Sequence, residues 1–256
     1  MRKCFDFRGQ VAVITGTSSG LGVQMAEAFA VEGANLVLLA RRMSRLEENA
    51  KAISEKYGVE VLPFACDITD TDNVKAAVKA TMEKFGRVDI LVNNAGTGGV
   101  GPAEETTDEQ FKHEMNVDLF GTFTCSREFG KEMIKAKYGR IINIASMYGL
   151  VGNMIVGSAP YHAAKGGVVN LTRALAAEWG KYGITVNSIC PGYFYTELTT
   201  ETLNSDLFKE IAETRIPIQR FGEEGELDSC ALFLASPASS YITGQNIAVD
   251  GGYTCV

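Results

Sequence analysis

Short apolar runs rich in β-branched residues recur along the chain, and longer segments with apolar residues at helical spacing separate them. Most runs are apolar at nearly every position, which is typical of strands covered on both faces of a sheet. In the first helical segment Ala26, Phe29 and Ala30 share one face, and in the third Val74 and Ala77 do the same. The predicted strands are 11–14, 35–39, 59–64, 89–93, 140–145, 184–189 and 246–249.

This alternation of strand and helix predicts an α/β fold, a doubly wound domain with a sheet of seven mainly parallel strands and helices on both faces. The 256 residues are 46% apolar and 21% charged, which suits one globular domain with a sizeable core. The pattern contains no linker, repeat or low-complexity segment. We therefore expect a single domain over residues 1–256.

Charge and cysteine usage narrow the choice of partner and compartment. The net charge of −7 without a basic tail argues against nucleic acid or an anionic membrane as a partner. No stretch of about 20 residues is apolar enough to cross a membrane, and residues 1–9 are charged, unlike a secretion signal. The cysteines form no C-x-x-C pair, so we expect small buried side chains in a reducing, cytoplasmic setting and no metal site. They are Cys4, Cys66, Cys125, Cys190, Cys230 and Cys255.

A glycine-rich turn follows the first predicted strand and opens a helix. Glycines at positions 16, 20 and 22 give the spacing G-x-x-x-G-x-G, which differs from the G-x-G-x-x-G dinucleotide fingerprint. Glycine lets the backbone turn sharply and approach a pyrophosphate, whose charge the helix N-terminus favours. We predict phosphate binding here, with a purely geometric role for the glycines as the alternative. The predicted contacts are Gly16, Ser18, Ser19, Gly20, Leu21 and Gly22.

The same turn contains a competing signal, because residues 16–20 spell G-x-S-x-G, the nucleophile elbow of α/β-hydrolases. A hydrolase would need an acid and then a histidine after Ser18. Only His113 and His162 are available, and neither follows a late strand in a turn-rich setting. A serine hydrolase therefore stays a distant alternative.

Two arginines follow the second predicted strand. NAD sites usually present an acidic residue there, whereas arginine accommodates the additional phosphate of NADP. Ala40 carries no carboxylate, and Arg41 with Arg42 supplies donors suited to a phosphate. We therefore expect NADP(H) to be preferred and NAD(H) to remain possible, unless both arginines merely start an exposed helix.

A tyrosine and a lysine, Tyr161 and Lys165, are four residues apart and share a face if the segment is helical. A cation beside a phenol favours the phenolate form, which suits a general acid/base working at neutral pH. The spacing alone is weak evidence, because chance supplies it readily. Ser146 closes a predicted strand at the sheet edge where ligands of open α/β sheets bind, so its hydroxyl is a candidate for holding a carbonyl oxygen.

Taken together, these segments resemble the short-chain dehydrogenase/reductase family, and the resemblance covers essentially the whole chain. It implies a Rossmann domain and an enzyme that interconverts a secondary alcohol and a ketone with NAD(P)(H). Several motifs in one order are specific even though none is so alone. They are the glycine turn, Cys66-Asp67, Asn93-Asn94-Ala95-Gly96, Asn116, Ser146, Tyr161-x-x-x-Lys165, Asn187, Pro191-Gly192, Thr196 and Val249-Asp250-Gly251-Gly252.

The resemblance also implies roles for individual residues. Tyr161 would transfer the proton, Lys165 would bind the nicotinamide ribose, and Asn116 would hold a water linked to Lys165. Asp67 with Ile68 would meet the adenine, and Asn94 with Ala95 and Gly96 would line the ribose. Nicotinamide contacts are implied for Pro191, Gly192 and Thr196. The implied substrate residues are Ser146, Met147, Asn153, Met154, Tyr161 and Tyr193.

The segment between Ser146 and Tyr161 spans 15 residues, about two more than is common in the family. It should wall the substrate pocket, and Pro160 suits the first turn of a helix. The chain looks most similar to gluconate 5-dehydrogenase-like members, so a sugar acid or polyol is the preferred substrate. Hydroxysteroid dehydrogenases and 3-oxoacyl reductases are alternatives, and a nucleotide sensor without catalysis is a distant one. Family members usually form tetramers through helices corresponding to 108–135 and 161–181, so we expect a homotetramer.

Overall fold

The computed structural model describes residues 5–197 and 199–256, so Cys4 and the first part of the charged N-terminus lie outside the described residues. Its centre is a seven-stranded sheet in the order β3-β2-β1-β4-β5-β6-β7, and each neighbouring pair is parallel. The strands are β1 (Val11–Thr15), β2 (Asn35–Ala40), β3 (Val61–Ala65), β4 (Ile90–Asn93), β5 (Gly139–Ile144), β6 (Ile184–Pro191) and β7 (Asn246–Val249). All seven predicted strands are confirmed, with ends that differ by two residues or fewer.

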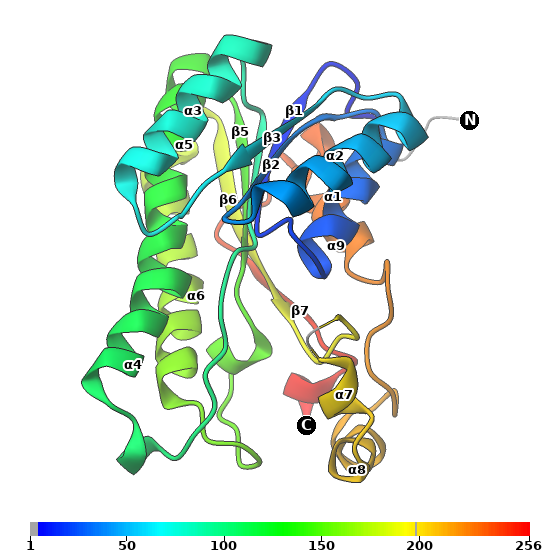
Figure 1. Ribbon diagram of the computed structural model, residues 1–256. Coiled ribbons are helices and arrows are strands. Elements are labelled where there is room, and N and C mark those ends of the chain that lie inside the picture. Colours follow the sequence, from blue (N-terminus) through cyan, green and yellow to red (C-terminus); the bar gives the residue numbers. More distant parts are fainter. Residues whose placement is uncertain (1–4, 198) are drawn as a thin grey trace.

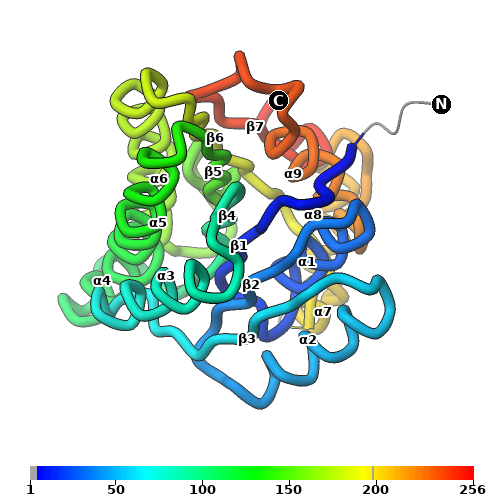
Figure 2. Tube along the Cα trace, turned by 90° about the horizontal axis from the view of Figure 1, so that it is seen from above, coloured from blue at the N-terminus to red at the C-terminus, as the bar shows by residue number. Residues whose placement is uncertain are grey.

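Helices cover both faces of the sheet (Figures 1 and 2). One face carries α1, α2 and α9, and the other carries α3, α5 and α6 (Figure 1). The α-helices are α1 (Leu21–Val31), α2 (Met43–Tyr57), α3 (Thr71–Phe85), α4 (Asp108–Glu114), α5 (Thr122–Ala136), α6 (Ala159–Trp179), α7 (Thr200–Leu203), α8 (Asp206–Arg215) and α9 (Asp228–Ala235). The helices of the described residues are too short or too polar to cross a membrane.

The two faces of the sheet have separate apolar cores. Phe29 of α1 and Ile53 of α2 are buried in the first core with alternate residues of β1 and β2. Phe129 of α5 and Leu175 of α6 are buried in the second. The predicted helix faces agree with this division, since Ala26 is buried in the first core and Val74 in the second. The central strands read as continuous apolar runs because both of their faces are covered.

The helix expected over residues 108–135 is interrupted. A π-helical segment, η2 (Met115–Gly121), joins α4 to α5. A π-helix widens the turn and shifts the register of the side chains, and such segments are frequent at functional sites. The start of α6 agrees with the prediction, because Pro160 stands in its first turn.

The strand order reverses between β1 and β4, since β2 follows on one side of β1 and β4 lies on the other. Parallel α/β sheets bind ligands at the carboxyl ends of the strands beside such a point. The glycine-rich turn after β1 and the Asn94 segment after β4 meet here, because Asn94 Nδ2 donates to the Thr15 carbonyl over 2.9 Å. The fold therefore provides a crevice between these two loops.

Candidate active site

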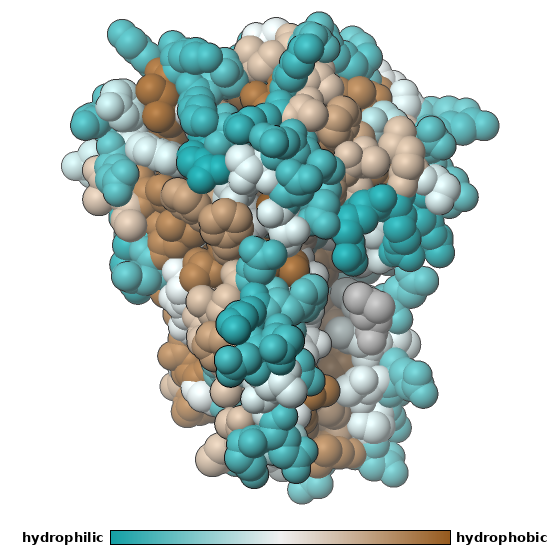
Figure 3. Space-filling model, turned by 60° about the vertical axis from the view of Figure 1, so that its left-hand side comes forward, coloured by the Kyte–Doolittle hydropathy of each residue, from teal (hydrophilic) through white to brown (hydrophobic). Residues whose placement is uncertain are grey.

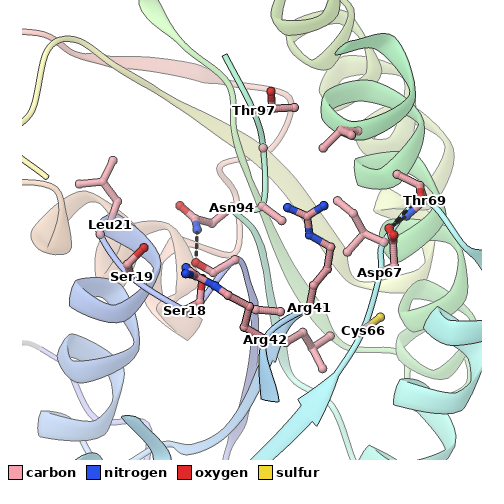
Figure 4. A pocket seen from close by; sticks show the side chains of 18 of the residues that line it. Ser18, Ser19, Leu21, Arg41, Arg42, Cys66, Asp67, Thr69, Asn94 and Thr97 are labelled. Carbon is pink, nitrogen blue, oxygen red and sulfur yellow. Dashed lines mark hydrogen bonds between the residues drawn. The ribbon is translucent and has the colours of Figure 1, made fainter. Parts of the chain in front are cut away.

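A cavity of about 880 Å³ opens at the carboxyl ends of β1, β2, β3 and β4 (Figure 4). Its volume is within the range of small-molecule and cofactor sites, roughly 300–1,000 Å³. Most of the predicted cofactor residues line it, together with residues that the sequence analysis did not select, such as Thr69, Thr97 and His113. The predicted residues that line it are Gly16, Ser18, Ser19, Gly20, Leu21, Arg41, Arg42, Asp67, Ile68, Asn94, Ala95, Gly96, Asn116 and Thr196.

The glycine turn leaves no space for side chains at two of its positions. Gly16 has φ +75°, and a Cβ there would meet the Ala95 Cα at 2.8 Å. A Cβ on Gly22 would meet the carbonyl oxygen of Gly16 and, at 2.5 Å, the Asn94 amide. Gly22 does not itself line the cavity, so its part is to let α1 pack against the turn. The backbone of the turn is thereby exposed to a ligand, as phosphate binding requires.

The N-terminus of α1 is free to bind an anion. Its first residue is Leu21, and the preceding Gly20, with φ +65°, brings no side chain to cap the helix. The first turn also carries no acidic residue. The backbone N–H groups of a helix N-terminus are unsatisfied within the helix and attract negative charge. The turn and the helix together fit the pyrophosphate of a dinucleotide.

The end of β2 brings positive charge to the same cavity. Figure 4 shows the Arg41 guanidinium directed into the cavity near Asp67, while Arg42 lies beside Ser18. Arg42 Nη2 donates to Ser18 Oγ over 3.1 Å. Hydrogen bonds from Thr69, followed in importance by the Arg41 charge, hold the pKa of Asp67 below its usual value. The site therefore holds two guanidinium groups and an ionised carboxylate beside them.

The catalytic candidates lie on α6 and at the end of β5. The Lys165 Nζ is 5.5 Å from the Tyr161 ring centroid and donates to the carbonyl of Ile144 over 3.1 Å. Ile144 ends β5, and Ser146 follows two residues later. The Ser146 hydroxyl is buried and accepts a hydrogen bond from the backbone N–H of Tyr148 over 3.1 Å. The three residues thus gather where β5 meets the first turns of α6.

Lys165 also contacts an acidic residue that the sequence motifs did not include. Lys165 Nζ forms an ion pair with Asp118 Oδ1 at 3.2 Å, and both side chains are buried. Asn116 lies two residues earlier and lines the large cavity. The π-helical segment carries both residues, and its widened turn presents Asp118 to Lys165. The structure therefore adds an acidic contact to Lys165, and the water-mediated role of Asn116 stays a prediction.

The predicted substrate residues are dispersed. Met147 is buried, whereas the Met154 side chain is 81% exposed. Asn153 instead orders its own loop, because it donates to the Val156 carbonyl and accepts from the Ile155 N–H. These three predicted contacts thus differ in exposure and environment.

Tyr193 belongs to an aromatic cluster that the sequence analysis missed. Its hydroxyl forms a hydrogen bond with the hydroxyl of Tyr148, and its ring contacts Tyr253. Tyr148 stacks on His162, next to Tyr161, at 4.7 Å between ring centroids. The members come from four separate segments of the chain. The one feature of the sequence that could have indicated the cluster is the position of Tyr148, two residues after Ser146.

The loop after β6 approaches the glycine turn. Pro191 ends β6, and the Gly192 N–H donates to the carbonyl of Val249, the last residue of β7, over 2.9 Å. A Cβ on Gly192 would meet the Asp250 Cα at 2.7 Å, so the glycine allows the close approach. Thr196 lies farther along the loop, and its Cβ is 3.6 Å from the position of a Cβ on Gly20. The loop therefore reaches back to the N-terminus of α1.

Comparisons with known proteins agree with this arrangement. A family model described as enoyl-(acyl carrier protein) reductase, of the short-chain type, matches residues 16–254. The chain is a short-chain dehydrogenase/reductase. As such it is an oxidoreductase that acts on CH–OH groups, and it interconverts an alcohol and a ketone with NAD(P). Two motifs of this family, the glycine turn and the Tyr161–Lys165 pair, have the geometry described above.

Relatives of this short-chain dehydrogenase/reductase include enzymes of sugar and polyol metabolism. It is 40% identical to a galactitol 2-dehydrogenase (L-tagatose-forming) of Cereibacter sphaeroides over 99% of this chain and 98% of the relative. It is 36% identical to a gluconate 5-dehydrogenase of Gluconobacter oxydans, over 98% and 96%. A crystal structure of a gluconate 5-dehydrogenase from Burkholderia cenocepacia in complex with NADP and tartrate is 34% identical, with a TM-score of 0.94 and 98% of each chain covered.

Proposed function

We propose that this enzyme uses NADP(H) in preference to NAD(H) and that its substrate is a sugar acid or a polyol. The observation that carries the proposal is the meeting of Tyr161, Lys165 and Ser146 at the carboxyl end of β5, beside a cavity with a glycine-rich anion site. A bound nicotinamide supplies the hydride chemistry. The residues of the chain supply orientation and proton transfer.

The proposed roles follow from the chemistry of each side chain. The Tyr161 phenol exchanges a proton with the substrate oxygen, and the buried ammonium of Lys165 favours the phenolate when the alcohol is oxidised. The Ser146 hydroxyl orients the substrate oxygen, since it closes the strand end on which Lys165 is anchored. Gly192 and Pro191 are proposed for the nicotinamide side, with Thr196.

The preference for NADP(H) rests on Arg41 and Arg42. Both face the cavity at the end of β2, and Ala40 offers no carboxylate to hold a ribose hydroxyl. Guanidinium groups form charge-assisted hydrogen bonds to phosphate. The solved gluconate 5-dehydrogenase with bound NADP supports the proposal by its similarity.

The substrate class rests on the aromatic cluster and the relatives. Tyr148, Tyr193 and Tyr253 bring their hydroxyl groups to a cluster that begins two residues after Ser146 and stacks on His162, the residue after Tyr161. Such a cluster suits a substrate with several hydroxyl groups. A steroid site would need apolar walls, yet Met154 points to solvent and Met147 is buried. A galactitol 2-dehydrogenase and a gluconate 5-dehydrogenase among the relatives favour the same class.

We also propose a homotetramer that works in the cytoplasm and has no nucleic-acid or membrane partner. Phe111 of α4 and the nearby Phe120 of η2 are each 42% exposed, and Figure 3 shows apolar residues on the side of the molecule that includes these helices. Contact between copies would bury this surface. The free cysteines of the described residues are compatible with a reducing compartment.

The test is a substrate panel with the purified protein and the Tyr161→Phe variant, measured with NADP(H) and NAD(H). Sugar acids and polyols should be oxidised, and Tyr161→Phe should lower kcat by about 10² to 10⁴, the usual contribution of a general acid/base. Tyr241→Phe is the matched control, because Tyr241 is fully exposed.

Cofactor fluorescence should show that Tyr161→Phe still binds NADPH. A variant with near wild-type turnover would refute the role of Tyr161. Turnover of a steroid or an acyl ester, with none of a sugar acid or polyol, would refute the proposed substrate class.

A further inference from the structure

The lysine that serves Tyr161 is held by a buried ion pair with Asp118. The Asp118 side chain is fully buried, and its Oδ1 accepts from Lys165 Nζ at 3.2 Å and from the Thr97 N–H at 3.1 Å. Gly96 makes room for this contact, because a Cβ there would meet Asp118 Oδ1 at 2.5 Å and Lys165 Nζ at 3.3 Å. The ammonium is thus fixed between the carbonyl of Ile144 and a carboxylate.

A second carboxyl group lies against the first. Glu114, the last residue of α4, is buried, and both acids accept hydrogen bonds from Thr97, which brings the two carboxyl groups together. Glu114 Oε1 accepts from Thr97 Oγ1 over 3.3 Å. Within the described part of the chain, Asp118 Oδ2 and Glu114 Oε2 are buried with no hydrogen-bond donor. Two ionised carboxylates would leave both atoms unsatisfied, whereas one proton held between the groups gives them a hydrogen bond.

The pKa shifts of Glu114 and Lys165 also favour a protonated Glu114 beside a charged Lys165. Burial, and then the hydrogen bond and charge of Asp118, raise the pKa of Glu114 above its ordinary value. Burial opposes the charge of Lys165, but Tyr161, Asp118 and Glu114 outweigh it and raise the pKa of Lys165. Burial raises the pKa of the Cys190 thiol on β6, which the positive charge of Lys165 only partly offsets. One ammonium, one carboxylate and one neutral carboxyl give a buried group without net charge.

We propose that Glu114 and Asp118 share one proton and act as a pair of positioning residues, which holds Lys165 and sets the pH range in which Tyr161 exchanges its proton. The inference rests on the proposed role of Tyr161. Asp118 carries a negative charge next to the ammonium, and this charge opposes a second negative charge on the Tyr161 phenol. The proton on Glu114 limits the two acids to that one negative charge.

The first test is the pH profile of alcohol oxidation in Asp118→Asn and Glu114→Gln. Asp118→Asn removes the carboxylate that contacts Lys165, and a charge left on Glu114 forms no ion pair with this lysine among the described residues. The midpoint of the rise in kcat should therefore fall by about one pH unit, the lower end of the effect of a nearby charge. Glu114→Gln imitates the protonated acid and should keep the wild-type midpoint. Glu109→Gln, an exposed acid in the first turn of the same helix, is the control. An unshifted midpoint in Asp118→Asn, or a lowered one in Glu114→Gln, would overturn the proposal.

The second test needs no turnover. A carboxyl with a raised pKa in the folded protein contributes stability that is complete below its unfolded pKa, near the ordinary value of 4.5, and that is lost as pH rises through the folded pKa. Glu114→Gln cannot lose this proton. Its free energy of unfolding, measured in urea, should therefore increase relative to that of the wild type as pH rises across that window, so that the variant becomes relatively more stable.

A difference between Glu114→Gln and wild type that is independent of pH would show that Glu114 is ionised in the folded protein, and would overturn the shared proton. If the wild type oxidised no alcohol in the panel, the proposed function would fail, and the unfolding measurements would still decide between a shared proton and two carboxylates. Circular dichroism of each variant identifies one that does not fold, and Glu114→Gln decides the matter if Asp118→Asn is such a variant.

Discussion

The proposed active site has a cofactor end and a substrate end, and the two are built in different ways. The cofactor end consists of short segments that each follow one strand, the glycine turn after β1, Arg41 and Arg42 after β2, and Asp67 after β3. The substrate end is assembled from residues far apart in the chain, with Tyr148 after β5, Tyr193 after β6 and Tyr253 near the C-terminus.

This difference follows from what each end must recognise. A pyrophosphate is bound mainly by backbone N–H groups, so the requirement is for glycine at fixed positions, and a local motif can supply it. A substrate is recognised by a few side-chain groups in a shaped pocket, which any residue of suitable reach can provide. The cofactor end should therefore fail when its backbone is obstructed, and the substrate end should change by degrees as single groups are removed.

The largest expected effect is that of Gly16→Ala. The alanine would have a positive φ of +75° and a Cβ at 2.8 Å from the Ala95 Cα. A strained left-handed residue costs about 1–2 kcal/mol, and overpacking adds about 1–3 kcal/mol. We expect a loss of unfolding free energy of about 2–5 kcal/mol and little remaining NADPH binding, measured by urea unfolding and fluorescence titration.

The matched control is Gly58→Ala. Gly58 also has a positive φ, +71°, and a Cβ there would meet nothing within 4 Å among the described residues. It should therefore cost about 1–2 kcal/mol of stability from the strain alone and leave cofactor binding unchanged. Equal losses of NADPH affinity in both variants would show that the glycine turn is not the phosphate site.

A smaller effect is expected from Arg41→Asp, which tests the same end through a side chain. A hydrogen bond to a charged group contributes about 1.5–3 kcal/mol, so the ratio of NADPH to NADH affinity should fall roughly 10- to 100-fold. Lys51→Asp is the control, because it changes the net charge equally from an exposed position later in α2. If both variants lower the ratio alike, the preference reflects overall charge and not a contact with Arg41.

The sequence predicted the fold and the locally spaced motifs of the site, but not the contacts between residues that are distant in the chain. Strands buried on both faces are continuous apolar runs, so all seven could be located. The glycine turn and the Tyr161–Lys165 pair depend on local spacing. The contact of Asp118 with Lys165 depends on a π-helical segment between α4 and α5, and an apolar helical pattern contains no signal for that change of register. The Tyr148–Tyr193 contact depends on how β5 and β6 are paired, which spacing along the chain does not show.

The smallest effect should come from Tyr193→Phe, which removes one group from the substrate end. Burial raises the pKa of both Tyr193 and Tyr148, so both phenols remain protonated at neutral pH. One of them donates the hydrogen bond between the two hydroxyl groups, which leaves the other free to donate to a substrate hydroxyl group. A neutral hydrogen bond contributes about 0.5–1.5 kcal/mol, so KM for a polyol should rise about 2- to 10-fold while KM for NADP⁺ stays the same. Met154→Ala is the control, because this side chain is 81% exposed and a surface substitution changes little. If Met154→Ala changes KM more than Tyr193→Phe does, the substrate contacts the loop over residues 149–158. The substrate end would then be formed by one short segment, like each part of the cofactor end.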